Sequence, residues 1–286
     1  MAGSDLTLSV PPIRYVIVHF HIFKNGGSTI ESILHREFSQ QFATIHGPSA
    51  GATLDSVDLA EFLERQPQIS ALSSHHLRYP KLSARRFVIF DWCFLRHPLD
   101  RLQSLYFYLA RLDSTDPLCQ RARRSTAAEF LEYLLDMAPH QVSDVQVTQL
   151  ARAGAFTRPA NERDLEQATA IVRQMAVPGL VEAFDESLVA AEYYLQPAFP
   201  TLRLEYTPLN VGRPRWETPI ERQQLLQQTW GADLYGRLSR VNQLDLELFH
   251  QMEKEVQQRL DKVPWFERRL AEFRSRCAGF GRAATA

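Results

Sequence analysis

Residues 14–38 read RYVIVHFHIFKNGGSTIESILHREF, and they carry the clearest structural signals in the chain. Its first part, residues 15–23, is an almost unbroken run of β-branched and aromatic residues, typical of a strand buried on both faces of a parallel sheet. Its last part carries apolar residues at helical spacing, namely Ile30, Ile33, Leu34 and Phe38. The stretch therefore predicts a strand, a glycine turn and a helix.

The turn carries the groups that bind an anion. Its residues are Lys24, Asn25, Gly26, Gly27, Ser28 and Thr29. Backbone N–H groups at a helix N-terminus, glycines that allow close approach, two hydroxyls and a Lys charge together suit a phosphate or sulfate. A glycine pair alone also fits a purely structural turn. The nucleoside-triphosphate pattern G-x-x-x-x-G-K-[ST] is excluded because Lys24 precedes both glycines, and the dinucleotide pattern G-x-G-x-x-G is absent.

A second buried strand, residues 86–95, delivers another basic group at its carboxyl end. Ligands of open α/β sheets bind beyond the carboxyl ends of the strands, so Lys24 and Arg96 are expected to face one crevice. The pattern R-x-P-x-x-R-x-x-S-x-Y begins at Arg96 and includes Ser104. Arg grips a phosphate with a planar and permanently charged fork, and Ser adds a neutral hydrogen bond. Alone, Arg96 is equally compatible with a surface position at a strand end.

These motifs resemble those of the sulfotransferases that use 3′-phosphoadenosine 5′-phosphosulfate (PAPS). KNGGST resembles the 5′-phosphosulfate loop, which commonly reads PKTGGT or PKNGGS in the carbohydrate-type members. In the first loop, Phe23 stands where that family has Pro. The pattern at Arg96 resembles the 3′-phosphate motif RDPxxRxxSxY, with His97 where that family has Asp. Residues 179–188, GLVEAFDESL, resemble the G-L-T-E-x-F-D-E-S-L block. The resemblance runs from about residue 15 to residue 256.

The resemblance implies transfer of a sulfuryl group from PAPS to a hydroxyl of a carbohydrate or glycoconjugate, with 3′-phosphoadenosine 5′-phosphate (PAP) as product. The cofactor-binding residues that it implies are Lys24, Asn25, Gly26, Gly27, Ser28, Thr29, Arg96, Ser104 and Arg213, with Arg215 and Trp216 as weaker assignments near the nucleotide. Lys24 is also assigned to charge stabilisation on the leaving phosphate oxygen. Residues 144–150, DVQVTQL, are similar to a D/N-x-Q-x-x-x-L stretch of the family, and a solvated helix face is the alternative interpretation.

In-line transfer also needs a base near the acceptor hydroxyl. A histidine with an ordinary pKa of about 6.5 can take such a proton at neutral pH. His76 is the first choice because its H-L-R-Y segment is similar to the family's G-H-F-x-Y. His75 is the runner-up, and Glu31 is an alternative. No carboxylate cluster suggests Mg²⁺, so no metal is expected.

The predicted fold class is α/β: a P-loop-like, three-layer fold with a central, mainly parallel sheet flanked by helices and a helix-rich C-terminal half. Further strands are predicted at residues 68–75 and 177–185, a helix at residues 58–66, and a polar connection at residues 40–56. Helix starts are predicted at Thr126, Asn161 and Thr218, each followed by the spacing of a capping box or by a helical pattern. The expected organisation is a tail at residues 1–12, a single domain at residues 13–278, and a tail at residues 279–286.

Composition narrows the class of protein. The chain has 286 residues, 45% hydrophobic and 23% charged, with a formal net charge of −1. These values are ordinary for a globular protein, and the net charge disfavours a general nucleic-acid binder. Three unpaired cysteines and no apolar run of membrane length predict a cytoplasmic protein without a membrane span. Two rivals remain: a P-loop-type nucleotide or small-metabolite kinase, and a non-catalytic nucleotide-binding module.

Overall fold

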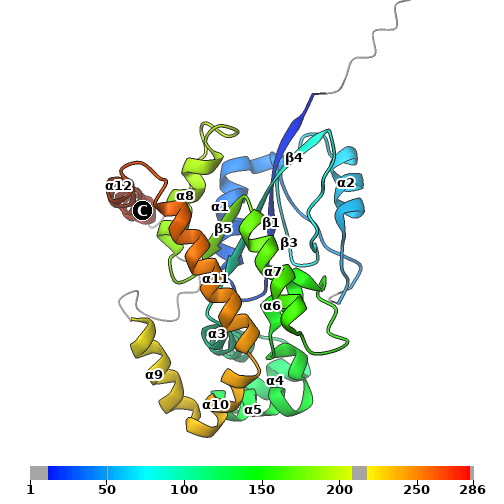
Figure 1. The fold of residues 1–286 in the computed structure, drawn as a ribbon, viewed down its shortest axis with the longest axis vertical. Helices are drawn as coiled ribbons and strands as arrows, with labels where there is room; N and C mark the ends of the chain where they lie inside the picture. The colour runs from blue at the N-terminus through cyan, green and yellow to red at the C-terminus, as the bar shows by residue number, and fades with distance from the viewer. Residues whose placement is uncertain (1–11, 50, 208–217, 284–286) are drawn as a thin grey trace, which may run out of the picture.

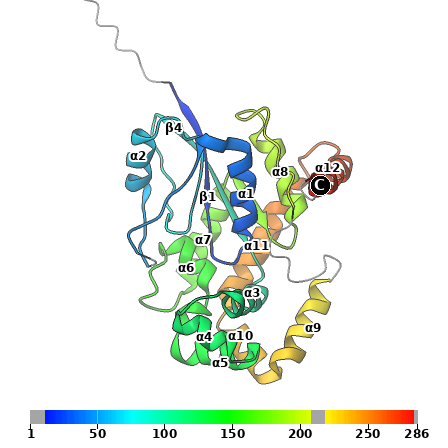
Figure 2. The same cartoon turned by 180° about the vertical axis from the view of Figure 1, so that it is seen from behind.

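The computed structural model describes residues 12–49, 51–207 and 218–283. Its centre is a five-stranded parallel sheet with strand order β2-β3-β1-β4-β5 (Figure 1). The strands are β1 Arg14–Phe20, β2 Phe42–Thr44, β3 Ala71–Ser74, β4 Phe87–Leu95 and β5 Val177–Leu180. Helices cover both faces, which confirms the predicted α/β class (Figures 1 and 2).

Two faces of β1 bury side chains in different layers, as its continuous apolar run predicts. Val16, Val18 and Phe20 belong to one hydrophobic core and Ile17 to another on the opposite face. The first core includes side chains of α2 Ser56–Arg65, α6 Val145–Ala151, α7 Glu162–Gln174 and α11 Gln243–Leu260. The second includes side chains of α1 Gly27–Phe38, α8 Phe184–Leu195 and α12 Phe266–Ala283. The three-layer prediction is therefore confirmed.

A third core lies beyond the carboxyl end of the sheet (Figure 1). Its helices are α3 Pro98–Arg111, α4 Pro117–Arg123, α5 Ala127–Met137, α9 Pro219–Trp230 and α10 Ala232–Arg240. Capping boxes begin α5, α7 and α9 at Thr126, Asn161 and Thr218, which confirms the three predicted helix starts. A fourth box at Asp55 begins α2, before the predicted start at residue 58. Helix α12 continues to Ala283, beyond the residue at which the sequence suggested a tail.

The strand predictions need correction at their ends. β1 stops at Phe20 instead of residue 23, because β3 is only four residues long and the last bond across this pair is from the His21 N–H to the Ser74 oxygen (3.0 Å). The strand predicted at residues 68–75 is Ala71–Ser74, and the one predicted at residues 177–185 ends at Leu180. The connection predicted at residues 40–56 contains β2. Its three residues are too few to show the alternation of apolar and polar residues that identifies a strand.

The strand order reverses at β1, in the middle of the sheet. After β1 the chain moves outward to β2, returns through β3 to one side of β1, and then places β4 on the other side. The carboxyl ends of β1, β3 and β4 consequently meet where the strand order reverses, which is where ligands bind in open α/β sheets. Across the described ranges, no helix combines the length and the apolar character that crossing a bilayer requires.

Candidate functional site

The loop after β1 leads directly into the N-terminus of α1. Gly26 is the residue before the helix, and its φ of 78° lies in the left-handed region that glycine adopts without cost. Lys24 also has a positive φ, of 70°, which is uncommon for a residue with a side chain. Within the described part of the chain, no side chain caps the start of α1. The Thr29 N–H donates to the Gly26 oxygen (3.1 Å), so the N–H groups of Gly27 and Ser28 are the ones that remain available to an anion.

Gly27 allows a close contact between the loop and the first strand. A Cβ atom at this position would lie 1.8 Å from Nε2 of His21, so no other residue fits without displacing the imidazole. Ser28 is exposed, whereas Thr29 is buried behind the helix start. Of these two hydroxyls, Ser28 is therefore the one that solvent and a ligand can reach.

The ammonium of Lys24 lies beside two aromatic rings that contact each other edge to face. Its Nζ is 3.9 Å from the ring centre of Tyr108 on α3 and 5.4 Å from that of Phe23. Burial lowers the pKa of Lys24 to about 8, and the nearby charge of Arg96 contributes to the shift. This cation is poorly solvated, so an incoming anion would meet an ammonium that water screens little.

Arg96 connects the end of β4 with the loop after β1. Its Nη1 donates to the backbone oxygen of Lys24 at 3.2 Å. Behind it, burial raises the pKa of Glu182 to about 7, although Arg96 and the backbone N–H of His97 (3.0 Å) oppose that shift. Ser104 is half-buried on α3. The structure thus brings Lys24 and Arg96 together.

Two residues of the predicted motifs point into the protein. The side-chain amide of Asn25, 1% exposed, donates to the backbone oxygen of Phe94 (2.8 Å) and to Oε1 of Gln146 (2.8 Å). Arg101 is buried and donates to the backbone oxygen of Gln141 (3.0 Å). Asn25 therefore shapes the loop from inside, and Arg101 holds α3 against the segment before α6.

A chain of hydrogen bonds connects two histidines of β1 and its exit with Glu31 on α1. Nδ1 of His21 lies 3.0 Å from Oε1 of Glu31, and the Ser73 hydroxyl donates to the same oxygen at 2.8 Å. Nδ1 of His19 lies 2.8 Å from the Ser73 hydroxyl. Burial alone would raise the pKa of Glu31, but the bonds from His21 and Ser73 hold it below its usual value. Burial lowers the pKa of His19 well below its ordinary value.

His19, His21 and Glu31 also form a group whose potential metal-ligating atoms lie within 4.8 Å of one another. Their mutual hydrogen bonds, with Ser73 between them, already account for their arrangement.

The two histidines after β3 differ in environment. The His75 ring lies against the His21 ring, with centres 3.6 Å apart, and its edge faces Phe23 at 6.0 Å. Burial lowers the pKa of His75 to about 4, with His21 adding to the shift, while a backbone hydrogen bond at His21 opposes it. His76 instead faces the segment before α2: its Nδ1 accepts the Gly47 N–H at 2.6 Å. A neutral His76 consequently carries its proton on Nε2.

Some site residues could not be assigned from the sequence. Tyr108, Glu182 and Gln146 contact the two loops through the fold. Glu182 and Gln146 belong to segments with a motif signal, whereas Tyr108 belongs to none. His21 had one signal, its position two residues after His19 on the same strand face. Arg213, Arg215 and Trp216 lie outside the described residues.

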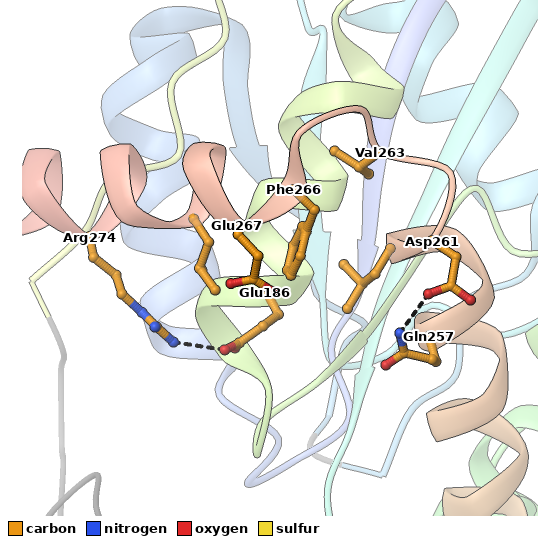
Figure 3. A pocket seen from close by; sticks show the side chains of 9 residues that line it. Glu186, Gln257, Asp261, Val263, Phe266, Glu267 and Arg274 are labelled. Carbon is orange, nitrogen blue, oxygen red and sulfur yellow. Dashed lines mark hydrogen bonds and ion pairs between the residues drawn. The ribbon is translucent and has the colours of Figure 1, made fainter.

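A separate cavity of about 560 Å³ lies between α8, α11 and α12 (Figure 3). In its wall Arg274 bonds Glu186 (2.7 Å), and Gln257 bonds Asp261 (2.7 Å). In the structure as described, the lining contains neither Lys24 and Arg96 nor the histidines near them. The cavity is therefore separate from the two basic loops.

The fold is an open, parallel α/β sheet with two basic loops at its strand-order reversal, the position at which such sheets bind ligands. The chain belongs to the Sulfotransferase family, whose model matches residues 13–252, and it is therefore a sulfotransferase. It is also 26% identical over 245 residues to an uncharacterized protein of Archaeoglobus fulgidus, an alignment that covers 84% of this chain and 96% of that protein.

Proposed function

We propose that this sulfotransferase moves the sulfuryl group of PAPS to a hydroxyl of a carbohydrate or glycoconjugate. The observation that carries the proposal is the contact between the two basic loops, in which Arg96 Nη1 reaches the Lys24 backbone oxygen at 3.2 Å. A nucleotide with phosphates at its 5′ and 3′ positions requires two neighbouring anion subsites. The family generally takes its sulfuryl group from PAPS, which supports the same donor.

The 5′-phosphosulfate is assigned to the loop after β1. The N–H groups at the start of α1 and the ammonium of Lys24 would bind the bridging region, where negative charge grows as the sulfuryl group leaves. The 3′-phosphate is assigned to Arg96 and Ser104, since Arg makes a bidentate contact and keeps its charge. In this proposal Asn25 does not touch the nucleotide and instead holds the loop from behind. No step in it depends on a metal ion.

The proposed base is His75, with His76 as the alternative. His75 lies beside Phe23 and against His21, next to the loop that carries Lys24. Its low pKa keeps the ring neutral at neutral pH, so one ring nitrogen has a lone pair for the acceptor proton. His76 is the weaker candidate because its Nδ1 lone pair already accepts the Gly47 N–H. Glu31 acts in the proposal through His21, whose ring it orients at 3.0 Å.

The three cysteines, Cys93, Cys119 and Cys277, are free thiols, and the first two are buried. This supports a reducing compartment, and we place the reaction in the cytoplasm.

A transfer assay tests the proposed function. The protein is incubated with PAPS labelled with ³⁵S in the sulfuryl group and with a panel of mono- and oligosaccharides, and the labelled sugars are separated from the nucleotide. We expect label on at least one sugar, none when the Lys24→Ala variant replaces the wild type, and one PAP formed for each ester. Transfer only to amines or to non-carbohydrate alcohols would contradict the carbohydrate assignment. Phosphate transfer from γ-labelled ATP would contradict the donor.

A further inference from the structure

Gln146 joins the two loops that carry the proposed phosphate subsites. It lies at the start of α6, with a side chain that is fully buried. Its Oε1 accepts from the Asn25 amide (2.8 Å) and from the Arg96 backbone N–H (3.0 Å), and its Nε2 donates to the Arg96 backbone oxygen (2.8 Å). One side chain therefore contacts both loops at once.

The geometry at Arg96 resembles that of a neighbouring strand. A primary amide has the same donor and acceptor as a peptide group, and Gln146 uses both of them on the backbone of one residue. The hydrogen-bonded ladder of β4 is in this way extended by one residue beyond Leu95. Asn25 adds a second connection at the same end, because its amide also donates to the Phe94 oxygen at 2.8 Å.

Gln146 is itself held by α11. Oδ2 of Asp245 accepts its backbone N–H at 3.0 Å, and Oδ1 accepts that of Val147 at 2.8 Å. The backbone N–H of Asp245 donates to Oδ1 of Asp144 at 2.9 Å. Because Asp245 is fully buried and caps α6, the start of this helix is fixed against the long helix behind it.

We propose that Gln146 is a positioning residue that sets the distance between the 5′- and 3′-phosphate subsites. The inference rests on the proposed function, since it assumes that Lys24 and Arg96 bind the two phosphates of one nucleotide. A ligand that binds two subsites gains binding free energy from both only when the distance between the subsites matches the distance between its two phosphates. Without Gln146 each loop keeps its charged side chain, but the bonds from Asn25 to the Phe94 oxygen and from Arg96 to the Lys24 oxygen are then left to hold the spacing of the two loops.

The test compares a bisphosphate with a monophosphate. Calorimetric affinities for PAP and for adenosine 5′-phosphate are measured on the wild type and on Gln146→Leu. The matched control is Gln149→Leu, which changes the same residue type three positions along α6, where the side chain is half-buried. For Gln146→Leu we expect PAP affinity to fall roughly tenfold and adenosine 5′-phosphate affinity to fall less than about threefold. We expect Gln149→Leu to leave the ratio of the two affinities unchanged.

The ratio of the PAP affinity to the adenosine 5′-phosphate affinity distinguishes a positioning role of Gln146 from a purely structural one. General destabilisation would lower the melting temperature without favouring one ligand over the other. An equal loss for both nucleotides, or no loss, overturns the inference, whereas a wild type that does not bind PAP overturns the proposed function instead.

If Gln146→Leu does not fold, Gln146→Glu takes its place. The protonated Glu side chain can make all three bonds and the ionised one cannot donate to the Arg96 oxygen. Its PAP affinity relative to wild type is therefore expected to rise as the pH is lowered from 8 to 6, and a constant ratio overturns the inference.

Discussion

The affinity for PAP is predicted to fall above pH 8 because Lys24 loses its charge. Burial lowers the pKa of this ammonium to about 8 in the free protein. A bound phosphate favours the charged form, so the pKa of Lys24 is higher in the complex than in the free protein. The contribution of Lys24 to binding is consequently complete below the pKa of the free protein and is lost as the pH rises above it.

The size of the effect follows from the fraction of charged Lys24. With a pKa of about 8, roughly nine-tenths of the side chains are charged at pH 7 and roughly one-tenth at pH 9. If the bound ammonium stays charged over this range, PAP affinity falls roughly tenfold between these two values. The phosphate groups of the ligand ionise near pH 6 and keep a constant charge above pH 7.

Calorimetry measures this effect in two ways. The dissociation constant is determined at intervals between pH 7 and pH 9, and the proton uptake on binding follows from buffers with different ionisation heats. Wild type is expected to take up close to one proton at pH 9. The Lys24→Arg variant keeps its charge over this pH range. Its PAP affinity is expected to be independent of pH, with no proton uptake at this position. A flat wild-type profile, or the same decline in Lys24→Arg, would refute the assignment of Lys24.

Three further predictions concern neighbouring residues. Arg96→Ala should weaken PAP binding roughly 10- to 100-fold through a lost charged hydrogen bond, with little effect on adenosine 5′-phosphate; equal losses for both nucleotides in calorimetry would contradict the 3′ assignment. His75→Ala should lower kcat at least about 100-fold with unchanged PAP affinity, whereas His76→Ala should keep most of its turnover; the opposite ranking in the sulfate-transfer assay would make His76 the base. Gly27→Ala should destabilise the fold by about 1–3 kcal/mol because its Cβ would overlap His21. In thermal denaturation Gly51→Ala is the control, since nothing lies within 4 Å of its added Cβ, and equal melting temperatures for the two variants would show that the contact at Gly27 is not rigid.

The sequence predicts the central elements of this fold well because their signals are local. The buried runs at β1 and β4 contain enough consecutive apolar residues to identify strands, and the Ser/Thr/Asn positions before α5 and α7 mark helix starts. The three-residue strand β2 could not be predicted, since its pairing with β3 depends on tertiary contacts.

The site is predictable only in part, for a similar reason. The sequence shows that Lys24 and Arg96 are basic residues that follow buried strands. It does not show in which direction their side chains point. Asn25 belongs to the glycine motif and yet turns inward to Gln146, which is 121 residues away along the chain. His75 and His76 are adjacent in sequence, and only the pairing of β3 with β1 brings one of them against His21.

The central claim is that the two basic loops bind one nucleotide with phosphates at both ends. The most direct measurement is a calorimetric titration of the purified protein with PAP, run beside ATP and adenosine 5′-phosphate under the same conditions. PAP is expected to bind most tightly, and Lys24→Ala and Arg96→Ala are each expected to weaken its binding. Preferred binding of ATP, or no binding of PAP, would overturn the proposed function.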